Sequence, residues 1–345
     1  MTRCADPYNL ALLRDHDTVT ALLSPAPAVT DPMDVDMRRV DEVIGQRLAS
    51  EVALINQISH YIVSAGGKRI RPRLVLLFSQ ALGFLGQERF ELAATVEFIH
   101  TATLLHDDVV DESSLRRGRQ TANALFGNAA SVLVGDFLYS RAFQMMVGVN
   151  RLRVLDVLAD ATNVIAEGEV LQLMNIRDAS LDEDAYLRVI RSKTAKLFEA
   201  SCRLAAVLAG SPPELEAACA EYGQSLGTAF QVIDDVLDYD GDAGEMGKNL
   251  GDDLREGKVT LPLILAMRLG TPDEAATIRQ AIETGSTTEL AAIVTIVRRC
   301  GALEGTRLLA AEQARRAIDA LRALPHNTHA DSLLELPAQL LQRRS

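Results

Sequence analysis

Apolar side chains recur every three or four residues along most of the chain, which is the spacing of one face of an α-helix. Val40, Ile44 and Leu48 repeat at intervals of four residues, and the segment that follows obeys the same rule. Two glycines and Pro72 in "SAGGKRIRP" interrupt the pattern before it resumes. The spacing predicts further helices over residues 74–85, 88–111, 128–148, 151–174, 182–209, 213–239 and 258–269.

Strand signals are nearly absent from the sequence. No alternating run is bounded by Asn-Gly or Asp-Gly, and no repeat has a period of 20–50 residues. The sequence therefore predicts an all-α fold with a single large helical domain over residues 34–345. We expect residues 1–33 to form an extension that is flexible in part, because "SPAPAVTDP" places three prolines in nine positions.

Composition narrows the class of protein. The 345 residues are 48% hydrophobic and 24% charged, which is typical of a globular protein, and the net charge of −12 disfavours a nucleic-acid partner. The four cysteines form no CxxC pair, which favours a reducing compartment. We expect a cytoplasmic protein, since neither a transmembrane run nor a signal-peptide pattern is present.

The stretch "LLHDDVVDESSLRRGR" carries a DDxxD pattern directly after an apolar helical run. Asp107 and Asp111 are four residues apart and share one helix face, and Asp108 lies beside them. Carboxylates at this spacing suit a hard divalent cation. A solvated acidic helix face is the alternative for a single motif of this kind.

A second copy, "QVIDDVLDYDGD", makes the solvated-face alternative harder to sustain. Asp234, Asp235 and Asp238 repeat the spacing, again at the end of an apolar helical run. We therefore expect both helices to be buried up to their acids, and the acids to face each other across a water-filled opening. Mg²⁺ shared with the phosphate oxygens of a substrate would neutralise this charge.

Basic residues near the motifs fit a phosphate or diphosphate substrate. Arginine can hold phosphate through two hydrogen bonds, and a Gly-rich turn lets the chain approach an anion closely. The alternative for each of them is an ordinary basic surface turn, and for His100 an ordinary core or surface histidine. The candidates are Lys68, Arg69, Arg71, His100, Arg116, Arg117, Lys193, Thr194, Lys248 and Lys258.

With these segments in place, the sequence resembles the trans-isoprenyl (all-trans-polyprenyl) diphosphate synthase family. The matching segments are "GGKRIRP", "EFIHTATLLHDDVVDESSLRRG", "VLVGDFLYSRAF", "RSKTAKLF", "FQVIDDVLDY" and "GKNLGDDLREGKVTLPLI", in the family's order from about residue 66 to 265. The resemblance implies an all-α fold around a deep central cavity, usually as a homodimer. It implies two substrates, isopentenyl diphosphate and an allylic prenyl diphosphate.

The resemblance also implies a role for each matching residue. Two or three Mg²⁺ ions would bridge the allylic diphosphate to Asp107, Asp108, Asp111, Asp234, Asp235 and Asp238. The allylic diphosphate itself would be held by Arg116, Lys193, Thr194, Gln231, Lys248 and Lys258. Isopentenyl diphosphate would be held by Lys68, Arg71, His100 and Arg117. The residues expected to act in catalysis are Asp107, Asp108, Asp111, Arg116, Lys193, Asp234 and Lys248.

The chemistry follows from these parts. Cations around the leaving diphosphate favour ionisation of the allylic C–O bond, and the isopentenyl double bond then attacks the carbocation. A proton is lost last, and no side chain is an obvious base for it. The released diphosphate is the better candidate.

Product length is the finest inference that the sequence supports. Ala102 and Thr103 precede Asp107 by about one turn, and both are small. In the family, bulky residues there stop growth early, so a long product of about C40–C50 is expected, although plain core packing is the alternative. Candidates for the floor of the tunnel are Phe143, Met145 and Met146.

The motifs most resemble bacterial octaprenyl- to decaprenyl-forming enzymes, which make the side chain of ubiquinone. A transient membrane contact would then release the product. A shorter-chain synthase of C15–C20 is the main rival. A terpene cyclase is disfavoured by 4% aromatic residues and no Trp, since cyclases steer cations with aromatic walls. A non-catalytic subunit is disfavoured by the complete motifs.

Overall fold

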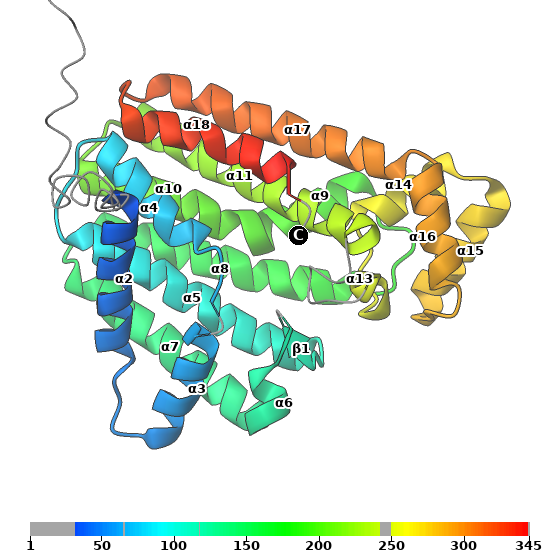
Figure 1. The fold of residues 1–345 in the computed structure, drawn as a ribbon, viewed down its shortest axis with the longest axis horizontal. Helices are drawn as coiled ribbons and strands as arrows, with labels where there is room; N and C mark the ends of the chain where they lie inside the picture. Colours follow the sequence, from blue (N-terminus) through cyan, green and yellow to red (C-terminus); the bar gives the residue numbers. More distant parts are fainter. Residues whose placement is uncertain (1–31, 65, 117, 242–249, 344–345) are drawn as a thin grey trace, which may run out of the picture.

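Long helices packed side by side make up the chain (Figure 1). The structure is a computed structural model, which describes residues 32–64, 66–116, 118–241 and 250–343. Within these residues the only strands are β1 (Leu115–Arg116) and β2 (Arg119–Gln120), which pair antiparallel as a short hairpin. The prediction of an all-α fold is therefore confirmed.

The helices follow one another with short connections. Two of them are irregular: η1 is a π-helix and η2 is a 3₁₀-helix. In chain order the helices are α2 (Pro32–Leu48), α3 (Ala53–Ser64), α4 (Ile70–Ala81), α5 (Glu88–Val110), α6 (Ala122–Phe126), α7 (Asn128–Gly148), α8 (Leu152–Met174), α9 (Glu183–Ile190), η1 (Arg191–Ala195), α10 (Lys196–Ala209), α11 (Pro213–Asp240), α13 (Asp252–Arg255), α14 (Leu261–Leu269), α15 (Pro272–Thr284), α16 (Leu290–Arg299), α17 (Ala302–Ala320), η2 (Leu321–Ala323) and α18 (Thr328–Leu341).

Most predicted helices match the structure, with four differences. The helix predicted to end at residue 85 ends at Ala81, and the one predicted over residues 182–209 is divided by the π-helix η1. The other two differences occur at prolines. α4 begins at Ile70, four residues before the predicted start, because Pro72 lies in its first turn rather than at a break. α14 begins at Leu261, three residues after the predicted start, again with a proline in its first turn. The first N–H groups of a helix have no partner within it, so a proline is tolerated there.

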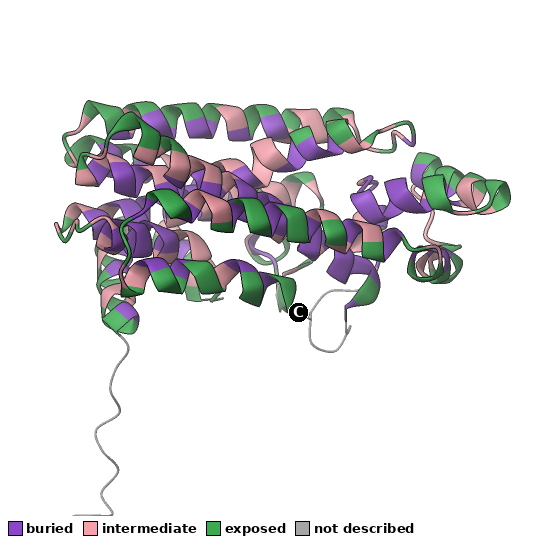
Figure 2. Cartoon of the chain, turned by 90° about the horizontal axis from the view of Figure 1, so that it is seen from above, coloured by how far each residue is buried: buried purple, intermediate pink, exposed green. Residues whose placement is uncertain are grey.

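The core lies between the long central helices. Phe78 of α4 and Tyr222 of α11 are fully buried and pack edge to face, with ring centroids 5.1 Å apart. Buried positions fill the inner faces of the bundle in Figure 2, and exposed positions lie on its outward faces. This arrangement is what the helical period of apolar residues predicts.

The domain boundary remains a prediction. α2 begins at Pro32, two residues before the predicted start of the helical domain, and Val40 and Ile44 anchor it in the core. The predicted extension, residues 1–33, lies almost wholly outside the described residues.

Candidate active site

A cavity of about 200 Å³ lies where α5 and α11 end. Asp107 and Asp111 line it from α5, and Asp234 and Asp235 line it from α11. The long apolar faces of both helices are buried in the core, so their last turns carry the acids to the edge of that core. Two acids from each of the two motifs therefore line one cavity.

Two lysines already neutralise the acids of α5. The Nζ of Lys193 lies 3.6 Å from Oδ1 of Asp107, and it also donates to Oε2 of Glu169 at 2.5 Å. The Nζ of Lys258 donates to Oδ2 of Asp111 at 2.8 Å and to Oε2 of Glu256 at 2.6 Å. The cavity is therefore a site of opposed charges rather than a bare acidic surface.

The charge in the cavity shows in the acid–base properties of its side chains. Burial lowers the pKa of Lys258, but the carboxylates of Glu256, Asp111 and Asp253 raise it more, so the net pKa lies above its ordinary value. Burial, helped by the charge of Asp107, raises the pKa of Glu169 to about 7, although Lys193 opposes this shift. Nearby carboxylates therefore contribute to both shifts, although burial is the main cause at Glu169.

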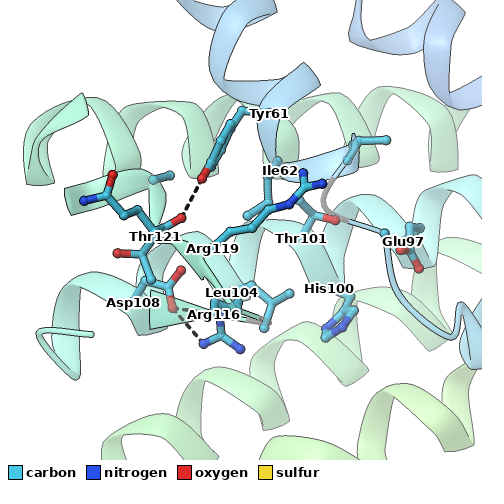
Figure 3. Close-up of a pocket in the computed structure, with 14 residues that line it drawn as sticks. Tyr61, Ile62, Glu97, His100, Thr101, Leu104, Asp108, Arg116, Arg119 and Thr121 are labelled. Atoms are coloured by element: carbon cyan, nitrogen blue, oxygen red, sulfur yellow. Dashed lines mark hydrogen bonds and ion pairs between the residues drawn. The ribbon is translucent and has the colours of Figure 1, made fainter. Parts of the chain in front are cut away.

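Asp108 is turned away from this cavity toward Arg116 (Figure 3). Both Nε and Nη2 of Arg116 donate to Oδ1 of Asp108, at 2.8 and 2.7 Å, and the carboxyl is fully buried. Burial raises the pKa of Asp108, and the charge of Arg116 opposes that shift. Asp108 therefore holds the arginine in place, and Oδ2 has no hydrogen-bond partner among the described residues.

The hairpin that carries Arg116 is fastened from a distant part of the chain. The hydroxyl of Tyr61 in α3 donates to the carbonyl of Gln120 at 2.7 Å, as Figure 3 shows. Thr121 Oγ1 donates to the carbonyl of Ser113 at 2.7 Å and closes the base of the hairpin. Arg116, on this hairpin, lines both the acidic cavity and a second, smaller cavity of about 30 Å³.

Asp238 also faces the protein rather than the cavity. Its Oδ1 accepts from the backbone N–H of Asp252 at 3.2 Å, and its carbonyl accepts from Gly251 at 2.9 Å. These bonds hold the start of α13 against the end of α11. Of the six predicted ligands, Asp107, Asp111, Asp234 and Asp235 line the acidic cavity, whereas Asp108 and Asp238 accept bonds from the chain around it.

Lys193 and Thr194 lie on the π-helix η1, which is wedged between two glycines. A Cβ on Gly168 of α8 would lie 2.7 Å from the backbone N of Lys193, and one on Gly227 of α11 would lie 2.7 Å from Cα of Ala195. Only glycine permits this approach from both sides. Single π-turns of this kind occur frequently at functional sites.

The residues predicted to bind isopentenyl diphosphate do not line a single cavity. Lys68 lines a cavity of about 720 Å³ beside Phe230 and Arg343, and burial, followed by the charge of Arg343, lowers its pKa. The Arg71 guanidinium lies over the ring of Phe198, 4.4 Å from its centroid. His100 instead lines the small cavity beside Arg116. Two further predicted residues, Arg117 and Lys248, lie outside the described residues.

The predicted chain-length residues differ in their burial. Ala102 of α5 is fully buried, and Thr103 is half-buried with its Oγ1 donating to the carbonyl of His100 at 2.8 Å. Met145 and Met146 of α7 are buried in the core. Phe143, in contrast, is 39% exposed and packs on Tyr139, so in the single chain it points to the surface rather than to an inner floor.

The donor set fits Mg²⁺ that is shared with a substrate. Among the described residues no three His, Cys, Asp or Glu side chains converge as a complete metal cage. Mg²⁺ is usually held by one or two carboxylates together with waters and phosphate oxygens, so an incomplete protein shell is what this ion needs.

A family model described as polyprenyl synthetase matches residues 52–298. The chain belongs to the polyprenyl synthetase family. The octaprenyl diphosphate synthase of Escherichia coli (strain K12) is 55% identical to it over 309 residues, covering 89% of this chain and 96% of that protein. The all-trans-nonaprenyl-diphosphate synthase (geranyl-diphosphate specific) of Rhodobacter capsulatus is 45% identical over 313 residues, covering 90% and 96%.

Solved structures of polyprenyl synthases share the fold. A polyprenyl synthase from Caulobacter crescentus CB15, complexed with calcium and isoprenyl diphosphate, superposes with a TM-score of 0.88 at 46% identity, covering 90% of this chain and 96% of that one. This member of the polyprenyl synthetase family is an enzyme, a prenyltransferase with the all-α isoprenoid synthase fold. None of the helices described here is long and apolar enough to cross a membrane.

Several residues of the polyprenyl synthase site escaped the sequence analysis. Glu169 could have been found, since it follows Ile165 by four residues and puts an acid on the buried face of the predicted helix. Tyr186 gave no signal beyond a place in an apolar helix. Further residues that line the acidic cavity and were missed include Gln172, Asp252, Asp253 and Glu256.

Proposed function

We propose that this enzyme adds isopentenyl diphosphate units to an allylic prenyl diphosphate and so makes a long-chain all-trans-polyprenyl diphosphate of about C40–C50. The single observation that carries the proposal is the acidic cavity, in which aspartates at the ends of α5 and α11 meet Lys193 and Lys258. The octaprenyl and nonaprenyl diphosphate synthases among its relatives support the long product. We propose that this product supplies the side chain of a quinone such as ubiquinone.

Asp107, Asp111 and Asp234 are the side chains best suited to hold Mg²⁺, since they line the cavity from both sides. Two or three ions are expected from the resemblance, and when bound they would draw negative charge onto the leaving diphosphate. Asp108, Asp235 and Asp238 support this set through the hydrogen bonds that they accept from the chain.

The allylic diphosphate is proposed to lie against cationic and polar groups on three elements. Lys193 and Thr194 face it from η1, Arg116 from the hairpin and Gln231 from α11, and all four line the acidic cavity. Lys258 adds a further cation, and Lys248 is proposed from the family's motif. These donors stabilise the charge that develops as the allylic C–O bond breaks.

Isopentenyl diphosphate is proposed to bind Lys68, Arg71, His100 and Arg117. Its double bond attacks the allylic carbon, one C–C bond forms, and the proton lost from the isopentenyl unit passes to the released diphosphate. The tail then grows along α5 past Ala102 and Thr103, whose small side chains leave room. Met145 and Met146 remain candidates for the floor.

Helices α7 and α8 carry exposed apolar side chains, which support the proposal of a homodimer. Single exposed apolar residues are ordinary, but several on adjoining helices form a patch typical of an interface. The domain over residues 34–345 would form this dimer in the cytoplasm, with a transient membrane contact for product release. The patch consists of Val132, Leu133, Phe143 and Val147 of α7 with Val170, Leu173 and Met174 of α8.

The proposal is tested by incubating purified protein with labelled isopentenyl diphosphate and farnesyl diphosphate. Label should enter a prenyl diphosphate only when both substrates and Mg²⁺ are present, and EDTA should abolish the reaction. Incorporation without an allylic substrate, or full activity in EDTA, would refute the proposed reaction. Formation of a cyclic hydrocarbon from farnesyl diphosphate alone would point to a cyclase instead.

A further inference from the structure

Asp235 accepts a hydrogen bond from the protein on each of its carboxylate oxygens. Its carboxyl is buried, and the hydroxyl of Tyr186 donates to Oδ2 at 2.6 Å. The side-chain amide of Gln231 donates to Oδ1 at 2.8 Å. These two donors hold the carboxyl group in a fixed position between α9 and α11, and loss of either bond would leave a buried polar group without a partner.

Its neighbours in the two acidic motifs differ from it. The side chain of Asp234 is 42% exposed and that of Asp107 is 19% exposed, and both line the acidic cavity. The residue beside a cavity-facing aspartate on a helix points about 100° away around the axis. The two adjacent aspartates of α11 thus have different environments, although the sequence presents them as a pair.

The bonds of Asp235 continue into the π-helix. Gln231 receives a hydrogen bond on Oε1 from Thr194 Oγ1 at 2.9 Å, while its amide N–H₂ donates to Asp235. Both ends of the Gln231 amide are therefore engaged. The connected series runs from Tyr186 of α9 through Asp235 and Gln231 of α11 to Thr194 of η1.

This series brackets Lys193. Tyr186 precedes the π-helix and Thr194 lies within it, and both are tied to α11 by the same pair of side chains. Asp182 caps the N-terminus of α9, because its side chain accepts a hydrogen bond from the N–H of Ala185 at 2.8 Å. The π-turn that presents Lys193 to Asp107 is therefore held on both sides.

We propose that Tyr186 is a positioning residue: by its hydrogen bond to Asp235 it fixes Gln231 and the π-turn, so that Lys193 and Thr194 meet the allylic diphosphate. In this arrangement Asp235 is an anchor within the protein and not a metal ligand. The inference rests on the proposed function, because the allylic diphosphate is assigned there.

The test compares Tyr186→Phe with Tyr222→Phe. Tyr222 is also buried, and its variant loses a hydrogen bond of similar length, from the hydroxyl to the backbone carbonyl of Leu333 at 2.7 Å, outside the acidic cavity. Both variants keep the ring and should lose similar amounts of thermal stability. Tyr186→Phe should raise the KM of farnesyl diphosphate about tenfold, which corresponds to about 1.4 kcal/mol of lost binding, because the π-turn that carries Lys193 and Thr194 is held less firmly. The KM of isopentenyl diphosphate should be unchanged.

Direct binding gives a second readout. Calorimetry with the unreactive thiolodiphosphate analogue of farnesyl diphosphate and Mg²⁺ should show the same loss of affinity in Tyr186→Phe and none in Tyr222→Phe. If the two tyrosine variants bind the analogue alike, the positioning role of Tyr186 is refuted. If the wild-type protein forms no condensation product, the proposed function fails, whatever the tyrosine variants bind.

The anchor role of Asp235 is tested by asparagine substitutions at the two adjacent aspartates. Asp234→Asn should raise the Mg²⁺ concentration for half-maximal binding of the analogue by about tenfold or more, since it removes an anionic ligand. Asp235→Asn keeps an acceptor oxygen for Tyr186, and a flip of the Gln231 amide lets its oxygen accept from the new amide while its N–H₂ donates to the Thr194 hydroxyl. The series of bonds is therefore kept, and that concentration should change less than about twofold. An equal rise in both variants would mean that Asp235 is a metal ligand and would overturn the inference.

Discussion

The Nζ of Lys258 lies 2.8 Å from Oδ2 of Asp111, although 147 residues separate them in the chain. The contact brings the segment after the second acidic motif against the first motif. Since Glu256 shares the same ammonium group at 2.6 Å, Lys258 neutralises two carboxylates at the edge of the cavity. The protein without metal thus supplies its own counter-charge.

Replacing Lys258 should destabilise the metal-free protein more than the metal-bound one. Lys258→Met leaves Asp111 and Glu256 half-buried and facing each other, and removing one partner of such a pair costs about 3 kcal/mol. Denaturant unfolding in EDTA should show this loss, and Mg²⁺ should recover part of it. Arg315→Ala breaks an exposed ion pair and should change the free energy of unfolding by less than about 0.5 kcal/mol. Equal losses in the two variants would contradict the account.

Glu169 should make the metal-free enzyme less stable as pH rises. Its pKa of about 7 in the folded protein exceeds the ordinary value of 4.5, so between these values the folded state binds more protons than the unfolded state. This contribution is fully present below about pH 4.5 and is lost as pH rises to about 7, with a size on the order of 1–3 kcal/mol. Glu169→Gln cannot ionise, so its unfolding free energy should depend less on pH in EDTA. The same slope in both proteins would refute the assignment.

Removing a carboxylate that faces the cavity should lower turnover strongly while the fold survives. Asp107→Ala or Asp234→Ala should lower kcat about a hundredfold or more, because stabilisation of the leaving diphosphate by metal is worth several kcal/mol. The unfolding free energy in EDTA should stay the same or rise, since repulsion between like charges is relieved. Asp156→Ala removes an exposed acid of α8 and serves as the control. Normal condensation rates in either cavity variant would eliminate the metal-site assignment.

Product length should respond to bulk beside Asp107. A phenylalanine costs nothing until the tail reaches it, and then costs about 1–3 kcal/mol of overpacking, which slows the next addition about tenfold or more. Thr103→Phe should therefore shift products to C15–C20 with early condensations unaffected. Ala102→Phe is predicted to shorten the products in the same way. Because Ala102 is fully buried, circular dichroism is used to check that this variant folds. Unchanged lengths in two folded variants would mean that the tail takes another path.

Local pattern was enough to predict the helices and the meeting of the two acidic motifs. The period of apolar residues fixed α5 and α7 almost to the residue, because both bury one face along their whole length. The predicted start of α4 was wrong, because a proline in the first turn of a helix and a proline at a helix break look the same in sequence.

The orientation of individual acids could not be predicted in this way. Asp234 and Asp235 are adjacent and identical in type, yet the side chain of Asp234 is 42% exposed, whereas Asp235 is buried and accepts from Tyr186. That difference depends on α9, which lies 49 residues away in the chain. The π-turn at Lys193 was likewise invisible, because it follows from close approach by Gly168 and Gly227 on two other helices.

The most direct test of the account is the product-length distribution of the purified wild-type enzyme. Farnesyl diphosphate, excess isopentenyl diphosphate and Mg²⁺ are incubated to completion, and the dephosphorylated products are analysed by mass spectrometry. The account predicts all-trans products that accumulate at about C40–C50, with shorter chains only as transient intermediates. Accumulation at C15 or C20, under conditions in which both substrates remain, would contradict it.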